Sequence, residues 1–270
     1  MKQLTNAHKN LALDYAAAEP EYNLFIIGDI ECYGLEGSHV SVYTADSWEG
    51  GSFPYIVLNY LGNFMVYSKD PRYDAESVGN FLTEQGAKEI TGKADVLEKL
   101  LPWLSDMQVR QTHLSRLNKM SVPPQSESLI RRMGQEDAED IYDLYMQIEE
   151  LTGYRHKGRE AAMESIRQNL NISGRTYGLY VTKGSEKRLV SIASTAAENS
   201  LSAMVIGVGT LKEYRKHGYA SAVISRLCHD CLQDGKQFLC LFYDNPEAGK
   251  IYKGIGFQEV GLYTMIQKKQ

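Results

Sequence analysis

The segment that most constrains the fold is a strand-like run followed by a basic turn and an amphipathic helix. Residues 203–209 read AMVIGVG, and residues 214–223 read YRKHGYASAV. After Gly218 the apolar residues recur at helical spacing, at Ala220, Val223, Ile224, Leu227 and Cys231. Residues 215–220 therefore lie at a helix N-terminus, whose first backbone N–H groups have no partner within the helix and attract anions. The segment predicts a pyrophosphate-binding strand, loop and helix.

Two other phosphate-binding loops are excluded. The nucleotide-hydrolase loop needs Gly-Lys-Ser/Thr after a four-residue spacer, and the chain has no such run. A dinucleotide fingerprint that began at Gly207 would need its third glycine at position 212, where Lys212 stands. The pattern that remains is Arg-x-x-Gly-x-Ala, formed by Arg215, Gly218 and Ala220.

Two motifs together resemble the GNAT (Gcn5-related N-acetyltransferase) superfamily. The stretch GVGTLKEYRKHGYASAVISRL resembles motif A of that superfamily, and YDNPEAGKIYKGIGFQEVG resembles its motif B. The motif B positions are Asn245, Pro246, Tyr252, Gly256 and Phe257. The resemblance covers the second half of the chain and implies an α+β fold, with a mixed, mostly antiparallel sheet flanked by helices.

A proline-rich stretch at residues 118–128, NKMSVPPQSES, divides the chain. We expect a first domain at 1–120 and a catalytic GNAT domain at 127–270. The first half resembles a degenerate GNAT repeat, as in tandem-domain members similar to glycine N-acyltransferases. No Arg-x-x-Gly-x-Ala follows its strand NFMVYS, so this half is not expected to hold a cofactor. Two roles stay open for it, shaping the substrate cleft or packing.

Both halves show the same order of elements, which suggests a duplicated architecture. Strands are predicted where apolar residues alternate or run together, and helices where they recur at helical spacing. In the first half we expect strands at 23–34, 39–46, 54–62, 63–69, 87–92 and 108–117, and helices at 74–86 and 93–104. In the second half we expect strands at 128–133, 176–184, 188–197, 201–209, 236–244 and 257–267, and helices at 135–151, 159–170, 219–231 and 245–256.

The resemblance implies acetyl-CoA as the acyl donor. Its pyrophosphate is assigned to the backbone amides of the turn, with charge added nearby by Lys216 and His217. The pantetheine arm is expected along the strand from Ile206 to Gly209, where a backbone N–H stabilises the developing negative charge on the thioester oxygen. The cofactor-binding set is therefore Gly207, Val208, Gly209, Arg215, Lys216, His217, Gly218, Tyr219, Ala220 and Asn245.

Some of these residues have a second interpretation. The two glycines of the strand fit a β-bulge that opens the sheet, or they only relieve crowding. Asn245 binds the pantetheine amide, caps the short helix that follows it, or does both. Tyr252 is the candidate general acid, because a phenol can protonate the departing thiolate, and the alternative is a packing residue that orients the cofactor.

The general base is left open. Glu198 lies in a turn before a strand and Asp244 lies at a strand end, so both are candidates. Glu149 and Glu150 could instead attract a cationic amine. An acidic side chain is more often a solvated surface charge, and none of the four is assigned as the base.

Composition narrows the remaining choices. The formal net charge of −5 argues against nucleic acid as a partner, and no apolar run reaches the length of a membrane span. The first ten residues lack the plan of a signal peptide, so we expect a cytoplasmic protein. Cys228 and Cys231, in the run CHDC, are expected to be buried thiols, because no second ligand pair for zinc has the usual spacing, and no metal is predicted.

The function expected is acetyl transfer from acetyl-CoA to a primary amine of a small molecule or peptide. One alternative is a longer acyl donor or an amino-acid acceptor, as the tandem resemblance suggests. Another is a non-catalytic acyl-CoA-binding or sensing protein, against which the intact motif B argues. Monomer and homodimer both stay open.

Overall fold

The computed structural model describes residues 1–121, 129–172 and 174–268. The chain forms two compact units. Unit 1 comprises Met1–Leu114 and Val260–Gln270, and unit 2 comprises Ser115–Glu259. The division differs from the domains expected at 1–120 and 127–270, because the last strand of the chain lies in unit 1. The proposed linker at 118–128 falls outside the described residues from position 122 onward.

Unit 1 is built on a sheet with the strand order β1-β2-β3-β4-β5-β12. Neighbouring strands are antiparallel except β4 and β5, which are parallel. Its elements are β1 (Lys2–Gln3), η1 (Asn6–His8), α1 (Lys9–Ala16), α2 (Leu24–Tyr33), β2 (Val40–Thr44), β3 (Ile56–Tyr60), β4 (Asn63–Tyr67), α3 (Ala75–Glu84), β5 (Glu89–Lys93), α4 (Ala94–Leu97) and η2 (Glu98–Trp103), with most of β6 (Met107–Leu117) and β12 (Gln258–Lys268).

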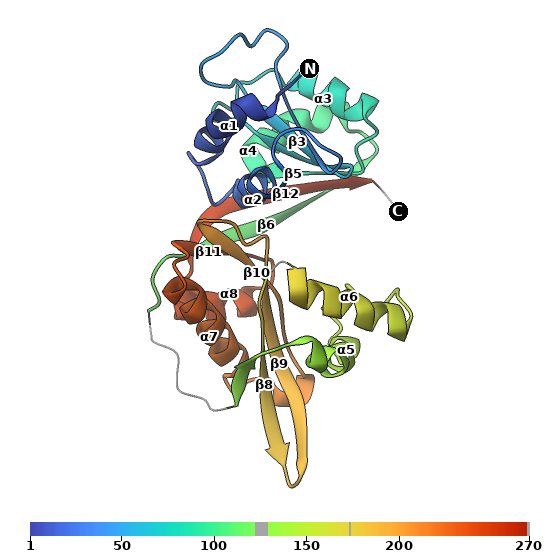
Figure 1. Cartoon of the computed structure of the whole chain (residues 1–270), viewed down its shortest axis with the longest axis vertical. Coiled ribbons are helices and arrows are strands. Elements are labelled where there is room, and N and C mark those ends of the chain that lie inside the picture. The colour runs from blue at the N-terminus through green and yellow to red at the C-terminus, as the bar shows by residue number, and fades with distance from the viewer. Residues whose placement is uncertain (122–128, 173, 269–270) are drawn as a thin grey trace. The chain divides into compact units, whose positions relative to one another are not determined.

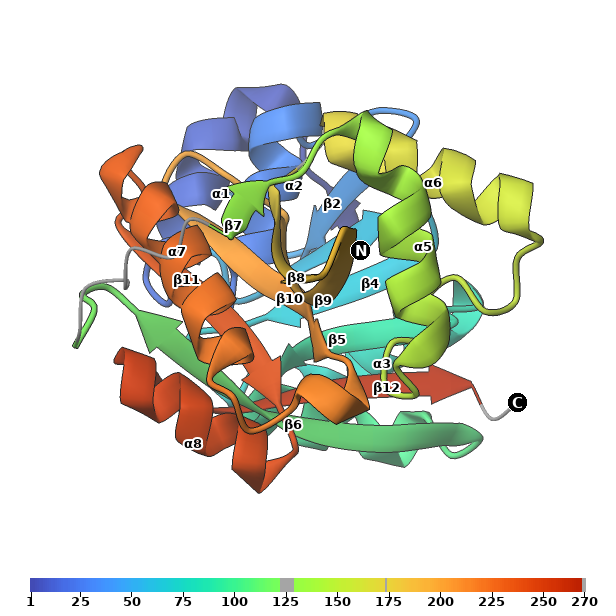
Figure 2. The same ribbon diagram turned by 90° about the horizontal axis from the view of Figure 1, so that it is seen from below.

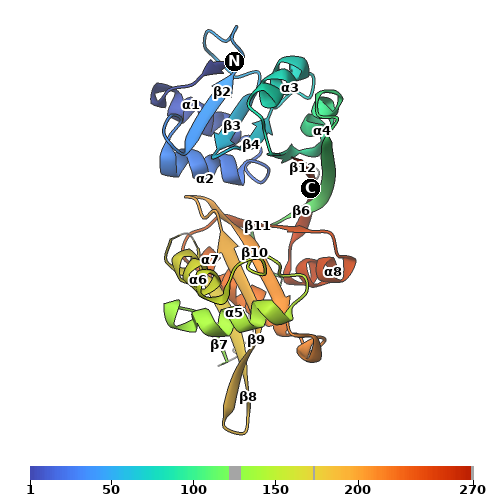
Figure 3. The ribbon, with the colours of Figure 1, turned by 90° about the vertical axis from the view of Figure 1, so that its right-hand side faces the viewer.

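Helices cover both faces of this sheet (Figure 3). Side chains alternate along a strand, and β3 shows the result. Ile56 and Leu58 pack with residues of α1 and α2, whereas Val57 packs with residues of α3 and α4. A strand buried on both faces reads as a continuous apolar run, as YIVL does here.

Two expectations for unit 1 need correction. The run at 23–34, NLFIIGDIECYG, was expected to be a strand and forms the helix α2. Its buried Ile26, Ile27 and Ile30 share a helix face, and a short apolar run alone does not distinguish a strand from a buried helix. The helix expected at 93–104 is an α-helix only as far as Leu97 and continues as the 3₁₀-helix η2, which contains Pro102. By contrast, the helix expected at 74–86 is confirmed, and its N-cap is Asp74, whose carboxylate accepts a hydrogen bond from the Ser77 backbone N–H.

The pairing of β12 explains why the chain end belongs to unit 1. Tyr263–Gln267 pair antiparallel with Glu89–Lys93 of β5, and Ile266 is fully buried in the core formed with α3 and β5. The chain thus returns to its first unit after completing the second.

Unit 2 is built on a sheet with the order β11-β10-β9-β8-β7. Helices α5 and α6 cover one face, and α7 and α8 cover the other (Figures 1 and 2). The strands and helices expected between 128 and 256 are found. They are β7 (Ile130–Arg132), α5 (Ala138–Gln147), α6 (Arg159–Ile172), β8 (Thr176–Lys183), β9 (Glu186–Ala196), β10 (Ser202–Thr210), α7 (Tyr219–Gln233), β11 (Phe238–Tyr243) and α8 (Pro246–Ile255). Two short 3₁₀-helices, η3 (Gln135–Asp137) and η4 (Lys212–Tyr214), were not expected.

The expected α+β class, with mixed sheets flanked by helices, is confirmed. Among the described residues no helix is both long enough and apolar enough to cross a membrane.

Candidate active site

The sheet of unit 2 opens between β10 and β11. The two strands pair in parallel only from Ser202–Phe238 to Val205–Leu241, although β10 continues to Thr210 and β11 to Tyr243. Beyond this point Ile206 is 44% exposed, and Gly207 and Val208 are partly exposed. The backbone of β10 thus presents groups on this edge that β11 does not pair. An extended ligand can add here as a strand would.

The bulge predicted at the two glycines is confirmed. The register of β10 against β9 shifts between Ile206 and Gly209, and Gly207 has a φ of +59°. A β-bulge bends the strand and increases its twist, which accounts for the departure of β10 from β11.

The same glycines also relieve crowding. A Cβ atom on Gly207 would lie 2.6 Å from the Tyr145 hydroxyl oxygen. A Cβ on Gly209 would lie 2.7 Å from Leu151 and 2.9 Å from Ile148. The two interpretations of the glycines are therefore compatible, because glycine permits both the bulge and the close approach of α5 and the residues after it.

The turn after β10 leads to an uncapped helix. Gly218 is the N-cap of α7 with a φ of +81°, and no side chain caps the helix. The first hydrogen bond within the helix runs from the Ala222 N–H to the Gly218 carbonyl, 3.0 Å away. The amides of residues 219–221 precede it and carry the partial positive charge of the helix end. This end of α7 is suited to an anion.

The side chains of the turn fix its shape. Lys216 adopts the left-handed conformation with a φ of +66°. The Arg215 guanidinium donates to the Thr210 carbonyl (3.0 Å) and to the Glu150 carboxylate (3.1 Å). The imidazole of His217 stacks on the ring of Tyr219. Arg215 therefore holds the turn against the end of β10 and leaves anion binding to the backbone.

Unit 1 lacks both features at the corresponding place. Its strands β4 and β5 pair in parallel over four consecutive residues, from Asn63–Glu89 to Val66–Gly92, with no register shift. Helix α3, which follows β4, is capped by the Asp74 carboxylate. A negative group already occupies this helix end, so a phosphate would be repelled. That the first half does not hold a cofactor stays an expectation.

Tyr252 lies on α8 against the end of β11 that diverges from β10. Its ring lies edge to face with that of Tyr243, at a centroid distance of 5.9 Å, and with that of Phe257 at 6.1 Å. Gly249 permits this packing, because a Cβ there would lie 2.5 Å from the Tyr243 ring. Burial raises the pKa of Tyr252, so its phenol keeps its proton at neutral pH. Among the described residues its hydroxyl has no hydrogen-bond partner, and it is available to donate to a ligand.

Asn245 is the N-cap of α8. Its side-chain oxygen accepts a hydrogen bond from the Glu247 backbone N–H at 2.9 Å. The capping role considered for Asn245 is confirmed, and Asn245 is otherwise exposed.

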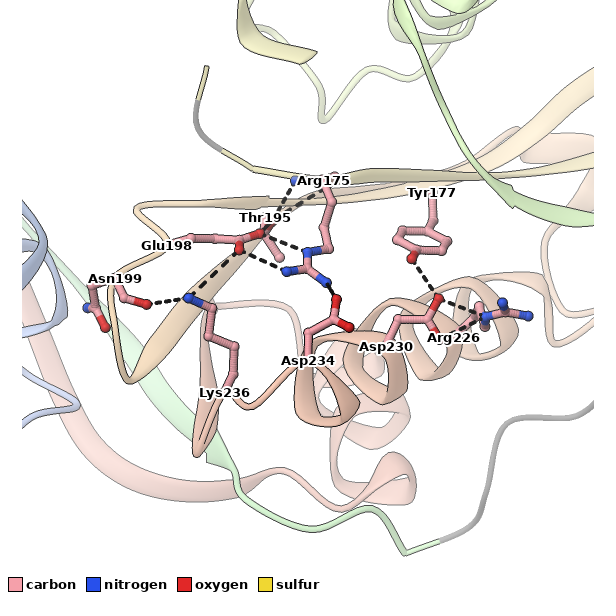
Figure 4. A network of polar contacts seen from close by, with 9 residues as sticks. All are labelled: Arg175, Tyr177, Thr195, Glu198, Asn199, Arg226, Asp230, Asp234 and Lys236. Carbon is pink, nitrogen blue, oxygen red and sulfur yellow. Dashed lines mark hydrogen bonds and ion pairs between the residues drawn. The ribbon is translucent and has the colours of Figure 1, made fainter. Parts of the chain in front are cut away.

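The structure removes one candidate base. Glu198 is 17% exposed and joins an ion-pair network with Arg175 at 3.1 Å and Lys236 at 4.0 Å (Figure 4). Burial alone would raise the pKa of Glu198, but hydrogen bonds from Arg175 and Thr195 outweigh it and hold the pKa below its usual value. A carboxylate held ionised in this way is a weak base. Glu150 is likewise paired, with Arg215, while Glu149 and Asp244 are exposed.

Cys228 and Cys231 are fully buried on α7, and Cys240 is fully buried on β11. Burial raises the pKa of both helical thiols, which makes them poor metal ligands. Within the described ranges no group of three or more His, Cys, Asp or Glu side chains could hold a metal ion.

The sequence did not indicate a cavity that lies beside the bulge. It has a volume of about 180 Å³ and is bounded by α5, α6 and strands β8 to β10. One of its walls is Tyr145 of α5, within the helix expected at 135–151. The sequence signal for the cavity was a tyrosine among the Ile and Leu residues of one helix face. A buried tyrosine hydroxyl usually has a hydrogen-bond partner, which can be a ligand.

Comparison with known proteins finds a family match in the region of the chain that contains the bulge and the turn. Residues 172–266 match the sequence model of the GNAT acetyltransferase family. The match includes the bulge, the turn, α7 and α8. No curated protein sequence matches the chain.

Several solved structures share the fold across nearly the whole chain. A GCN5-related N-acetyltransferase from Kribbella flavida has a TM-score of 0.59 at 15% identity, covering 92% of this chain and 96% of its own. A tandem GNAT protein from the clavulanic acid biosynthesis pathway has a TM-score of 0.60 at 12% identity, covering 98% and 96%. A Drosophila protein has a TM-score of 0.64 at 14% identity, covering 99% and 98%. The chain therefore has the fold of these structures, and the family match over residues 172–266 supports a transferase.

Proposed function

We propose that unit 2 transfers an acetyl group from acetyl-CoA to a primary amine of a small molecule or peptide. The observation that carries the proposal is the opening between β10 and β11, next to the uncapped N-terminus of α7. The opening can pair with an extended amide-containing arm, and the helix end can bind a pyrophosphate. Acetyl-CoA has both groups. When bound, it would supply the acetyl group as a reactive thioester.

The residues that bind the donor are those of the bulge and the turn. Backbone amides between Arg215 and Ala220 bind the pyrophosphate. Lys216 adds positive charge beside it, and His217 lies in the same turn. Backbone groups of Gly207, Val208 and Gly209 pair with the pantetheine arm, and one N–H there holds the thioester oxygen. Asn245, besides capping α8, is close enough in sequence to the end of β11 to contact the arm.

Tyr252 acts as the general acid. The nitrogen of the neutral amine forms a C–N bond to the acetyl carbon while the C–S bond breaks. Tyr252 donates its phenolic proton to the thiolate that leaves, and the nitrogen releases a proton to solvent, from which Tyr252 is reprotonated. Burial keeps the Tyr252 phenol protonated at neutral pH, so a proton is present, and the role rests on the position of the ring beside the end of β11.

No carboxylate is assigned as the base. Glu198 is committed to Arg175 and Lys236, which argues against it. A neutral amine arriving from solvent needs no base before it attacks. Proton loss afterwards can go directly to water through the open edge of the sheet.

Two alternatives remain distinct from this proposal. A longer acyl donor or an amino-acid acceptor would use the same residues. A non-catalytic acyl-CoA sensor would keep the turn but would have no need of Tyr252. Cytoplasmic location, the lack of a nucleic-acid partner and a monomeric or homodimeric state stay with the proposal as expectations. That unit 1 is a degenerate GNAT-like repeat is likewise an expectation.

The proposal is tested by following CoA thiol release from acetyl-CoA in the presence of amines, amino acids and peptides. We expect release that depends on an amine and yields one acetylated amine for each thiol. Tight acetyl-CoA binding without amine-dependent release from any acceptor would favour the sensor. Faster release with a longer acyl-CoA would favour the other acyl donor.

A further inference from the structure

The cavity beside the bulge has walls without charge. Twelve of the residues that the structure describes line it, and all twelve are uncharged at neutral pH. They are Ile141, Tyr145, Tyr154, Ile166, Asn169, Leu170, Gly174, Thr176, Ser194, Thr195, Ala196 and Ile206. Such walls favour an uncharged group, because an ionised group loses its hydration there and finds no charged partner.

Most polar atoms of the walls are already paired. The hydroxyls of Thr176 and Ser194 lie 2.9 Å apart and bond to each other. The Asn169 amide donates to the Tyr154 hydroxyl at 2.9 Å. Thr195 accepts from the Arg175 backbone N–H at 2.8 Å. With these atoms bonded to one another, the lining, which is polar as well as apolar, offers a ligand few unpaired groups.

The volume limits the size of the ligand group. An engineered apolar cavity of about 150 Å³ is large enough to bind benzene. The cavity here, at about 180 Å³, therefore has room for one aromatic ring or a branched chain of similar size.

Tyr145 connects the cavity to the bulge. Its ring lines the cavity and lies edge to face with that of Tyr154, at a centroid distance of 5.2 Å. Its hydroxyl oxygen lies 2.6 Å from the point that a Cβ on Gly207 would occupy. Burial raises the pKa of this phenol, so the group is neutral. Among the described residues no hydrogen bond is found for this hydroxyl. A free hydroxyl thus stands where the cavity meets the strand proposed to hold the thioester.

We propose that this cavity receives the side group of the acceptor, and that the acceptor is a primary amine carrying a neutral aromatic or branched aliphatic group. The Tyr145 hydroxyl accepts a hydrogen bond from the amine nitrogen and aims it at the acetyl carbon. The inference rests on the proposed acetyl transfer and adds the class of acceptor to it.

Two acceptors that differ by one charge test whether the cavity favours an uncharged group. Phenethylamine and para-carboxyphenethylamine differ by one carboxylate on the ring that would enter it. With the full chain and saturating acetyl-CoA, we expect kcat/KM for the carboxylated amine to be lower by about a hundredfold or more. Equal values for the two amines, or a preference for a diamine such as putrescine, would overturn the inference.

Variants of the walls test the location. Ala196→Leu adds bulk to the cavity, so kcat/KM for phenethylamine falls while that for ethylamine is kept. Tyr145→Phe removes the hydrogen bond and raises KM for phenethylamine about two- to tenfold, with acetyl-CoA affinity unchanged. Tyr142→Phe is the matched control on the same helix, since Tyr142 does not line the cavity and contacts Arg159 instead. Equal KM values in the two tyrosine variants would remove Tyr145 from the site.

A binding measurement separates this inference from the proposed function. Ligand-observed NMR with the CoA-loaded protein reports whether phenethylamine binds, whether or not any amine is acetylated. Binding that Ala196→Leu abolishes supports the cavity as the acceptor pocket even if transfer fails. If phenethylamine does not bind, or binds equally well to the Ala196→Leu protein, the inference is wrong even if other amines are acetylated. The melting temperature and acetyl-CoA affinity of each variant confirm that it is folded.

Discussion

The Arg175 Nε atom lies 3.1 Å from the Glu198 Oε1 atom, and both side chains are largely buried, at 10% and 17% exposure. The pair joins the start of β8 to the turn between β9 and β10, and Asp234 extends it to the end of α7 at 2.6 Å from Arg175 (Figure 4). A residue that looked like a candidate base in the sequence is thus a structural partner. The contribution of Glu198 can be measured as a change in the free energy of unfolding.

Glu198→Gln is expected to lower the free energy of unfolding by about 3 kcal/mol at neutral pH, because it leaves Arg175 buried without its main partner. The stability loss caused by Glu198→Gln should be smaller at acidic pH than at neutral pH. The folded pKa of Glu198 lies below the unfolded value of about 4.3, so the pair stabilises fully above that pH. Its contribution is lost as pH falls through the folded pKa.

Urea unfolding at neutral pH and at several acidic values measures this effect. The difference between the parent and the Glu198→Gln protein should shrink as the pH falls below about 4. Glu164→Gln is the control, because Glu164 forms an exposed pair with Arg167 and should change stability by about 0.5 kcal/mol or less. If both variants lose the same small amount, the Arg175–Glu198 pair does not stabilise the fold.

A second prediction concerns the last strand. Ile266→Ala should destabilise unit 1 by about 2–4 kcal/mol, because Ile266 is fully buried in the core that α3 and β5 share. Hydrogen exchange should quicken in β4, β5 and β12, while acetyl-CoA affinity stays unchanged. Gln267→Ala, at the neighbouring exposed position, should have little effect. Faster exchange confined to β10 and β11 would mean that β12 stabilises the other unit instead.

Much of unit 2 could be predicted from the sequence, because local signals agree with the fold there. The apolar stripe of α7, the start of α8 at Pro246 and the bulge glycines each carry their own pattern. The pairing of β12 with β5 in unit 1 has no such local sequence pattern. A strand reads the same whichever sheet it pairs with, so its partner is decided by tertiary contacts that the sequence does not show.

The site was predictable where backbone chemistry defines it and not where distant side chains do. The turn from Arg215 to Ala220 was found because glycine and a helix start leave a local signal. The cavity was not, because Tyr145 and Ala196 come from separate elements that meet only in the folded unit. Likewise, Glu198 could not be recognised as an ion-pair partner, since Arg175 lies 23 positions away.

Removing one hydroxyl tests the chemical role of Tyr252. Tyr252→Phe keeps the ring contacts with Tyr243 and Phe257, so stability should change little. If Tyr252 donates its proton to the thiolate, kcat and kcat/KM fall together, by roughly a hundredfold, with acetyl-CoA affinity nearly unchanged. Single-turnover acetylation at saturating acetyl-CoA measures the chemical step. An unchanged rate would exclude Tyr252 as the acid, and weaker acetyl-CoA binding alone would make it an orienting residue.

The central claim is that the chain binds one acetyl-CoA, at the turn before α7. Gly218→Glu places a negative charge at this helix end, and Gly235→Glu is a matched control at the opposite end of α7. Both glycines have positive φ, of +81° and +94°, and a Cβ on either would meet open space, so the two variants should suffer similar backbone strain. Only the change at Gly218 should repel the pyrophosphate.

Calorimetric titration of acetyl-CoA into the full chain tests this claim most directly. We expect one site per chain in the parent and in the Gly235→Glu protein, and no measurable binding to Gly218→Glu at a similar melting temperature. Two sites per chain would contradict the assignment of the donor to unit 2 alone. Binding to Gly218→Glu with the affinity of the parent would show that the turn from Arg215 to Ala220 does not hold the cofactor.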